Sequence, residues 1–145
     1  MTTDNGPETR TTPVHLMLRE VWNRGDIALV DELVTDDHVH YDPLVPEPLE
    51  GREALKGWVE TVREGTPDLT KTVRETYVDD DAVVVTYTTM GTHEGEIMGI
   101  APTGRPFEVD GVYVHHLAEG RIEETLDTWD AFGLFSQIGV FPEVA

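Results

Sequence analysis

The sequence predicts an α+β domain in which three N-terminal helices precede a curved antiparallel sheet of about four long strands plus short edge strands. Two observations predict this class. Apolar residues recur at helical spacing up to Gly65, and from Leu69 onward they alternate with a period of two. Helices that come first and strands that come afterwards are typical of α+β rather than α/β domains. With the helices across its concave side, such a sheet would form a cone with a central pocket.

Three helices are expected before the sheet. The first spans Pro13–Asn23, with apolar residues on one side. These residues are Val14, Met17, Leu18, Val21 and Trp22. Asp26 is expected to cap a second, short helix that ends near Thr35. A short strand over His38–Asp42 and a proline-rich link lead to the third helix, Arg52–Gly65.

Four strands with alternating patterns should follow. They are expected over Leu69–Val78, Ala82–His93, Arg105–Leu117 and Ile122–Asp130. Asp130 is expected to cap a closing helix over 131–139. The stretch Gly91–Val109 between the second and third strands is far longer than a tight hairpin needs. We predict that it folds over the mouth of the pocket and that Ile97 and Met98 form an apolar edge there, with ordinary loop packing as the alternative.

Length and composition favour a single domain. The chain has 145 residues, of which 1–12 read as a polar, disordered lead and 13–145 as one α+β domain. It contains no cysteine, which fits a reducing cytoplasm. No run of about 18 apolar residues exists to span a membrane, and the polar start lacks the apolar core of a secretory signal.

The chain is strongly acidic. Its formal net charge is −19, with ten basic residues, and its lysines are Lys56 and Lys71 alone. Such a surface repels nucleic acid and anionic membranes, so neither is expected as a partner. Because the acidic residues are spread along the chain, they indicate a solvated surface, and we expect a halophilic source in which salt screens their repulsion.

Asp127 is the leading candidate for chemistry. Alternation places it on one face of the last strand with Thr125 and Trp129, and we expect that face to line the pocket beside Tyr113. Desolvation would raise the pKa of such a carboxyl group and make it a general acid or base. The alternatives are an aspartate that faces solvent or one that is paired with an arginine.

Several histidines are candidate acid–base partners. His93, His115, His40 and His38 are considered, each with a hydrogen-bonded structural role as the alternative. His38 and His40 share one side of a strand and could bind a metal with His93 or His115. The chain has no HExxH motif and no spaced cysteine set, so we expect no metal. The glycine-rich loop lacks a phosphate-binding motif, and no other cofactor is expected.

Three segments resemble the SnoaL-like polyketide cyclase family of the nuclear transport factor 2-like superfamily. They are DHVHYDPLVPEPLEGREALKGWV, GTHEGEIMGIAPTGRPFEV and GRIEETLDTWDAFGLFSQIG, within a resemblance that runs from about Val14 to Gly139. The resemblance implies a cone-shaped fold, a homodimer through the outer sheet face, and chemistry without metal or cofactor. It also implies that Asp127 is the acid–base group that deprotonates a carbon next to a carbonyl.

The chain departs from that pattern at two positions. Tyr113 and Thr125 stand where the resemblance implies histidines. The limonene epoxide hydrolases share the fold, and their site would map onto Asp127 with His40 and Asp42 nearby. Tyr87 and Thr89 would replace the arginine and first aspartate of those enzymes, so epoxide hydrolysis is disfavoured. Proton transfer of the ketosteroid isomerase type needs only one carboxylate and an oxyanion donor.

The sequence therefore leads to three hypotheses. The first is a cyclase- or isomerase-type enzyme in which Asp127 acts as acid–base, with Tyr113 and His115 or His93 facing the substrate oxygen. Its substrate would be small, mostly apolar and carbonyl-containing, in a pocket whose expected binding residues are His40, Asp42, Tyr87, Met98 and Trp129. The second is a binding module for an apolar ligand. The third is a dimeric scaffold whose pocket is filled by side chains such as Trp129, Phe132 and Met98.

Overall fold

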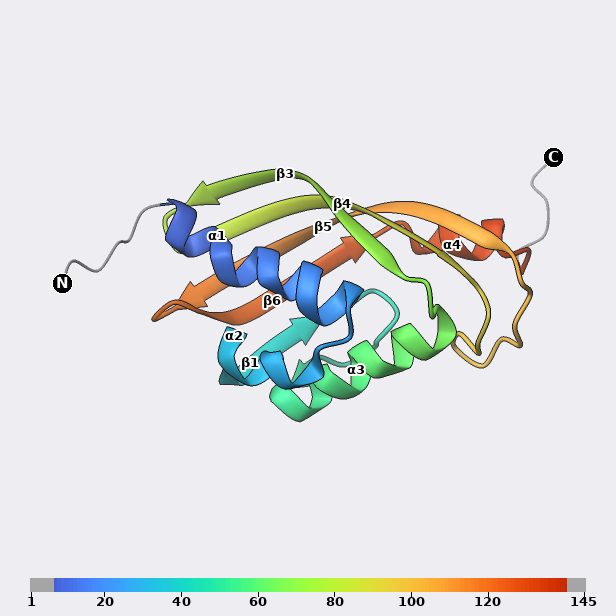
Figure 1. Cartoon of the computed structure of the whole chain (residues 1–145), viewed down its shortest axis with the longest axis horizontal. Coiled ribbons are helices and arrows are strands. Elements are labelled where there is room, and N and C mark those ends of the chain that lie inside the picture. The colour runs from blue at the N-terminus through green and yellow to red at the C-terminus, as the bar shows by residue number, and fades with distance from the viewer. Residues whose placement is uncertain (1–6, 141–145) are drawn as a thin grey trace.

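Six strands form one curved sheet in the order β2-β1-β6-β5-β4-β3 in the computed structural model, which describes residues 7–140. The strands are β1 (Val34–Tyr41), β2 (Leu49–Glu50), β3 (Thr70–Asp79), β4 (Ala82–Thr92), β5 (Pro106–Ala118) and β6 (Arg121–Trp129). Figure 1 shows the long strands arching over the helices. The predicted α+β class and curved sheet are confirmed. Within the described residues, no helix combines the length and the apolar character needed to cross a bilayer.

The first helix begins earlier than predicted. Helix α1 covers Pro7–Leu16 and continues as a π-helix over Met17–Asn23. Every apolar residue expected on its inner side is buried. The expected start at Pro13 was wrong, because Pro13 lies inside the helix although proline is favoured at the first helical position. The predicted lead therefore contributes 7–12 to a helix, and 1–6 lie outside the described residues.

The remaining helices match the predicted order. A 3₁₀ turn over Ile27–Leu29 leads into α2 (Val30–Leu33), α3 spans Arg52–Gly65 as predicted, and α4 spans Ala131–Gln137. Asp130 caps α4 as expected, since its carboxylate accepts a hydrogen bond of 2.8 Å from the Gly133 N–H. The predicted cap at Asp26 was wrong. Asp26 occupies the N-cap position, but its side chain makes no capping hydrogen bond.

Strand β1 differs most from the sequence prediction. It begins at Val34, four positions before the expected His38, and pairs in parallel with β6. The sheet is therefore mixed rather than wholly antiparallel. The sequence did not indicate the start of β1 because the exposed residues Asp36 and Asp37 interrupt the apolar pattern. Its direction depends on a partner 85 to 88 residues away along the chain, which local periodicity does not reveal.

The pairing register arranges the inner face in rows. One row joins Tyr87 on β4, Gly111 on β5 and Trp129 on β6. The next row pairs Tyr113 with Asp127. Because side chains alternate between the two sides of a sheet, all these residues point toward the helices. The chemistry-bearing residues of three strands are thus gathered at one end of the concave face.

Candidate active site

An open cleft lies between the concave face of the sheet, α3 and the loop that joins β4 to β5. It encloses about 700 Å³ of space, including solvent at its mouth. Its walls are largely apolar, with Trp22, Trp58, Phe107, Trp129 and Leu134 among the lining residues. A few polar side chains also line it; they are Asp42, Thr61, Thr66, Lys71, Tyr87, Thr89, Glu96 and Asp127. Mostly apolar walls with a few polar groups are typical of small-molecule sites.

The β4–β5 loop borders this cleft, as the sequence predicted. Ile97 and Met98 line the same space as Asp127. The loop is held against the end of α3, since the Gly95 N–H donates a 3.0 Å hydrogen bond to the Gly65 carbonyl. A Cβ on Gly95 would lie 2.0 Å from the Glu64 carbonyl oxygen, so only glycine permits this approach. Figure 1 shows the loop beside the C-terminal end of α3.

Asp127 is buried in the cleft and is 4% exposed. Its Oδ1 accepts a 2.5 Å hydrogen bond from the Tyr87 hydroxyl. Burial raises the pKa of Asp127 from 3.8 to about 7, and the neighbouring Asp42 adds to this rise. The Lys71 charge and the Tyr87 hydrogen bond oppose the rise. Burial and the Asp127 charge raise the pKa of the Tyr87 phenol, so this hydroxyl stays a donor.

Gly111 makes the Tyr87–Asp127 contact possible. The Tyr87 ring crosses over β5 at this glycine to reach Asp127 on β6. A Cβ on Gly111 would lie 2.5 Å from the Tyr87 hydroxyl oxygen and 2.8 Å from the Trp129 Cβ. Any side chain at position 111 would therefore displace Tyr87 or Trp129.

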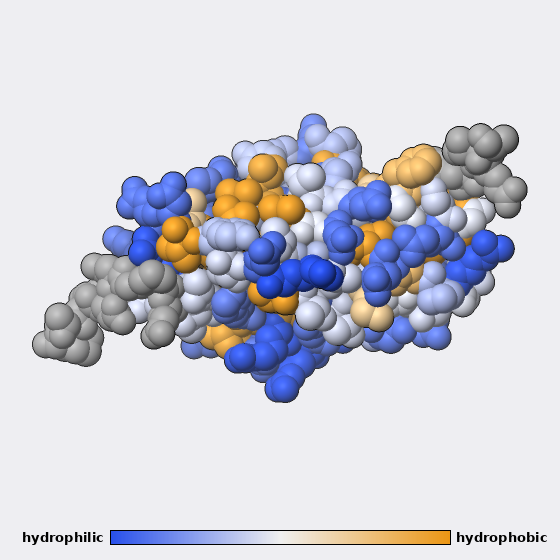
Figure 2. Space-filling view, turned by 90° about the horizontal axis from the view of Figure 1, so that it is seen from above, coloured by the Kyte–Doolittle hydropathy of each residue, from blue (hydrophilic) through white to orange (hydrophobic). Residues whose placement is uncertain are grey.

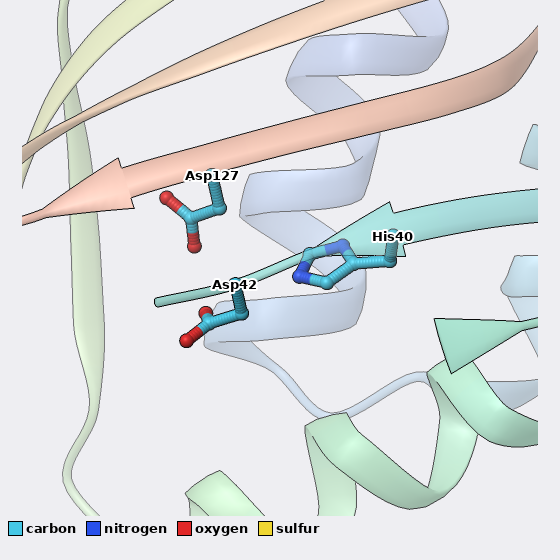
Figure 3. Close-up of side chains that lie close together, drawn as sticks. All are labelled: His40, Asp42 and Asp127. Atoms are coloured by element: carbon cyan, nitrogen blue, oxygen red, sulfur yellow. The ribbon is translucent and has the colours of Figure 1, made fainter. Parts of the chain in front are cut away.

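Asp42 lies next to Asp127 and forms a carboxyl pair with it. One ligand atom each from His40, Asp42 and Asp127 lies within 4.8 Å of the others, and Figure 3 shows the three side chains converging. Asp42 accepts hydrogen bonds from the Leu44 N–H at 2.9 Å and from Trp129 Nε1 at 3.2 Å. Burial raises the pKa of Asp42, and these hydrogen bonds oppose the rise. Two carboxylates this close favour sharing one proton.

Lys71 is a site residue that the sequence reasoning missed. Its side chain lines the cleft from β3, and Nζ donates a 3.2 Å hydrogen bond to Thr89 Oγ1. Nζ also lies 4.8 Å from the Trp22 ring centroid and 4.6 Å from that of Tyr87. Burial lowers the pKa of Lys71, whereas Asp127 and Asp42 raise it. The sequence did contain a clue to this role. The chain has only two lysines, and Lys71 falls within the predicted strand Leu69–Val78.

Tyr113 and His115 lie beneath the cleft rather than in its lining. They border a second, smaller cavity together with His38, His40 and Thr125. The Thr125 hydroxyl lies 3.0 Å from His38 Nε2 and 2.9 Å from His115 Nδ1. Burial lowers the pKa of His38 to about 4 and those of His40 and His115 to about 3. These neutral rings support the floor of the cleft, and Tyr113 stacks between Tyr87 and His115.

His93 does not border the cleft. It is fully buried in the β4–β5 loop, where its Nδ1 lies 3.0 Å from Thr103 Oγ1 and 3.3 Å from the Thr103 backbone nitrogen. His93 therefore holds the two ends of the loop together. Of the other expected binding residues, Asp42, Tyr87, Met98 and Trp129 line the cleft, whereas His40 lines the inner cavity.

Among residues 7–140, one group of side chains could act as metal ligands. His40, Asp42 and Asp127 are the group of three ligand-type side chains whose atoms gather closely, rather than the histidine set considered from sequence. The carboxylate oxygens already accept hydrogen bonds from Tyr87, Trp129 and Leu44. Lys71 lines the same cleft and would repel a cation. This donor set therefore suits proton exchange better than metal binding.

Comparison with known proteins places these features in a family context. A family model described as SnoaL-like polyketide cyclase matches residues 12–138. Among curated proteins, the chain is similar to aklanonic acid methyl ester cyclase AcmA of Streptomyces galilaeus, with 39% identity over 49 residues. That match covers 34% of this chain and 34% of AcmA, about a third of its length.

Solved structures agree over nearly the whole chain. The structure of a candidate SnoaL-like polyketide cyclase from Jannaschia sp. CCS1 has a TM-score of 0.87 at 24% identity, covering 97% of this chain and 100% of that one. IdmH of Streptomyces antibioticus, a candidate polyketide cyclase, has a TM-score of 0.77 at 30% identity, covering 90% of this chain and 99% of IdmH. The cone-shaped fold implied by the three sequence segments is thereby confirmed.

The raised pKa of Asp127 predicts a specific dependence of stability on pH. Between about pH 4 and about pH 7 the folded state keeps a proton that the unfolded state has released, because the folded pKa lies above the ordinary 3.8. The stability that this proton contributes is lost as pH rises through that range. The free energy of unfolding of the wild type, minus that of Asp127→Asn, should therefore fall from about pH 4 to about pH 7.

Urea unfolding at a series of pH values measures this difference. The subtraction removes the contributions of the buried histidines, which both proteins share. A difference that stays constant across the range would mean that Asp127 titrates normally.

Proposed function

The chain belongs to the SnoaL-like polyketide cyclase family, and on that premise we propose that it is a cyclase- or isomerase-type enzyme in which Asp127 moves a proton on a carbonyl-activated carbon. The observation that carries the proposal is the buried Asp127 carboxyl group in the apolar cleft, with its pKa raised to about 7. A general base is most effective when its pKa lies near the working pH. The substrate would be a small, mostly apolar molecule with a carbonyl group.

The surroundings of Asp127 support a role in proton transfer. Tyr87 holds Oδ1, and Asp42 is the second side-chain partner of this carboxyl group. Because Asp127 lines the cleft, its carboxyl group can face a C–H bond of the substrate. Asp42, kept in place by Trp129 and Leu44, opposes ionisation of Asp127 and so strengthens it as a base.

The two other hypotheses have less support. A binding module would have an Asp127 that is salt-bridged or fully hydrogen-bonded, and no ion pair of Asp127 occurs among residues 7–140. A vestigial scaffold would have its cleft filled by side chains. Met98 and Phe132 are instead 52% and 59% exposed, and the cleft is open.

We also propose that two copies associate through the outer face of the sheet. Large apolar side chains are exposed on that face; they are Tyr41, Tyr77, Met90, Val112 and Leu126. The register places all five on the side away from the helices. Figure 2, viewed from above the arch of Figure 1, shows apolar side chains exposed among hydrophilic ones. Burial of this apolar area would supply the free energy of association.

Hydrogen–deuterium exchange tests the proposed function. In deuterated buffer at high salt, the wild type should catalyse C–H exchange on members of a panel of β-keto esters and cyclic enones, followed by NMR. Asp127→Asn should lower the rate by about 100-fold or more because general-base catalysis is lost. The wild-type rate should rise as pH passes through about 7, where Asp127 becomes a carboxylate.

Asp130→Asn is the matched control, since Asp130 is exposed at the end of the same strand and asparagine can also cap α4. It should exchange at the wild-type rate. Equal exchange by the wild type and Asp127→Asn on every active substrate would overturn the assignment of Asp127.

The dimer proposal predicts a change of mass in solution. Sedimentation equilibrium should give twice the mass of the chain for the wild type. Leu126→Glu should give a monomer, because a carboxylate in the centre of the outer face opposes its burial. Glu124→Gln, on the same face of the same strand, is the control that should remain dimeric. A monomeric wild type would contradict the proposal.

A further inference from the structure

Proton abstraction beside a carbonyl group needs a partner for the oxygen on which negative charge develops. The groups that the sequence suggested for this task do not lie in the cleft. Tyr113 and His115 border the inner cavity, and His93 is buried in the β4–β5 loop. The Tyr87 hydroxyl already donates its hydrogen bond to Asp127. The substrate oxygen therefore requires a different partner.

Lys71 is the only cationic side chain in the lining of the cleft, among the residues that the structure describes. Its Nζ lies 4.8 Å from the Trp22 ring centroid, 4.6 Å from that of Tyr87 and 5.5 Å from that of Tyr113. The faces of aromatic rings attract cations. Burial lowers the pKa of this amine, whereas the ring faces and the two carboxyl groups of the site favour the ammonium form.

The position of Lys71 is fixed by contacts at both its backbone and its side chain. The Asn23 side chain accepts a 2.7 Å hydrogen bond from the Lys71 N–H and donates one of 2.8 Å to the Lys71 carbonyl. Nζ donates to Thr89 Oγ1 at 3.2 Å. A group that is held in place before the ligand binds is typical of catalytic sites.

The ammonium group still has donors to offer. It carries three N–H bonds, and Thr89 is its one hydrogen-bond acceptor among residues 7–140. In the same part of the chain, no direct ion pair joins Lys71 to Asp127 or Asp42. An oxygen atom of a ligand in the cleft can therefore accept a hydrogen bond from Nζ.

We propose that the Lys71 ammonium holds the carbonyl oxygen of the substrate and stabilises the enolate that forms when Asp127 removes the adjacent proton. In this step the electron pair of the C–H bond becomes part of the C=C bond of the enolate, and the π pair of the C=O bond moves onto the oxygen. The proton passes to Asp127, and Lys71 keeps its own protons. A fixed positive charge stabilises the developing enolate more than the neutral ketone, so it lowers the barrier.

The inference rests on the proposed function and adds an orientation for the substrate. The carbonyl oxygen should point toward β3, which carries Lys71, and the acidic C–H bond toward β6, which carries Asp127. Because the two side chains do not form a direct ion pair, a C–C=O unit of the substrate can lie between them.

Binding of 4-nitrophenol tests this role of Lys71 without turnover. Its phenolate presents a planar oxyanion, as an enolate does, and absorbs visible light, whereas the neutral phenol does not. Asp127→Asn is the host protein, because its neutral side chain resembles the protonated Asp127 that accompanies the enolate. We expect the anion to bind at least about tenfold more tightly than the neutral phenol, so that bound 4-nitrophenol titrates at a lower pH than free 4-nitrophenol.

Two variants in the same host complete the experiment. Lys71→Met removes the ammonium but keeps a long side chain against the rings, so the preference for the anion should disappear while the neutral phenol still binds. Lys56→Met is the matched control, because it removes the same charge at the surface, where Lys56 pairs with Asp31 and Glu53. It should leave the preference unchanged.

The measurement on the host alone can overturn the proposal, whether or not Lys71→Met folds. Bound 4-nitrophenol that titrates at the same pH as free 4-nitrophenol would do so, and so would a phenolate that does not bind. A preference for the anion that survives in Lys71→Met would also overturn it. Because phenolate binding needs no general base, loss of hydrogen–deuterium exchange alone would count against Asp127 and not against the oxyanion site.

Discussion

The structure depends on keeping the Asp127 carboxyl group out of water in an otherwise apolar cleft. A charged carboxylate in such a place is strongly disfavoured unless it is neutralised or hydrogen-bonded. The chain meets this constraint with a short hydrogen bond from Tyr87, with Asp42 as a neighbour that raises the pKa of Asp127, and with Lys71 nearby. Each of these contacts comes from a different part of the chain. The cleft therefore exists only when the whole sheet and its helices have assembled.

Several structural details follow from that constraint. Gly111 lacks a side chain, so Tyr87 can cross β5 to reach Asp127. Trp129 forms part of the wall and holds Asp42 through its indole N–H. The π-helix places Trp22 against Lys71 and ends at Asn23, which fixes the β3 backbone. The neutral histidines beneath the cleft fill space without adding charge to it. The family membership accounts for the shared cone, while these particular contacts define what this chain can do with it.

The sequence was informative wherever one local pattern decides the outcome. The spacing of Leu55 and Val59 located α3, and strict alternation placed Asp127 on the inner face. It was less informative where distant segments meet. The position of Lys71 depends on its pairing with Thr89 and on a bulge in β3 after Val73, and the partnership of Asp42 with Asp127 depends on the parallel pairing of β1 and β6. His93 was expected at the pocket because it ends a strand, but the loop folds around it.

The protonation of Asp127 is the central claim, and it can be measured directly. A ¹³C NMR titration of the aspartate carboxyl carbons, with Asp127 assigned by its absence in Asp127→Asn, reports the pKa of this one group in the folded protein. The account predicts a midpoint near pH 7, well above that of the exposed aspartates. A midpoint near the ordinary value of 3.8 would show that Asp127 is a fully ionised, solvated carboxylate, and would contradict the account of the site.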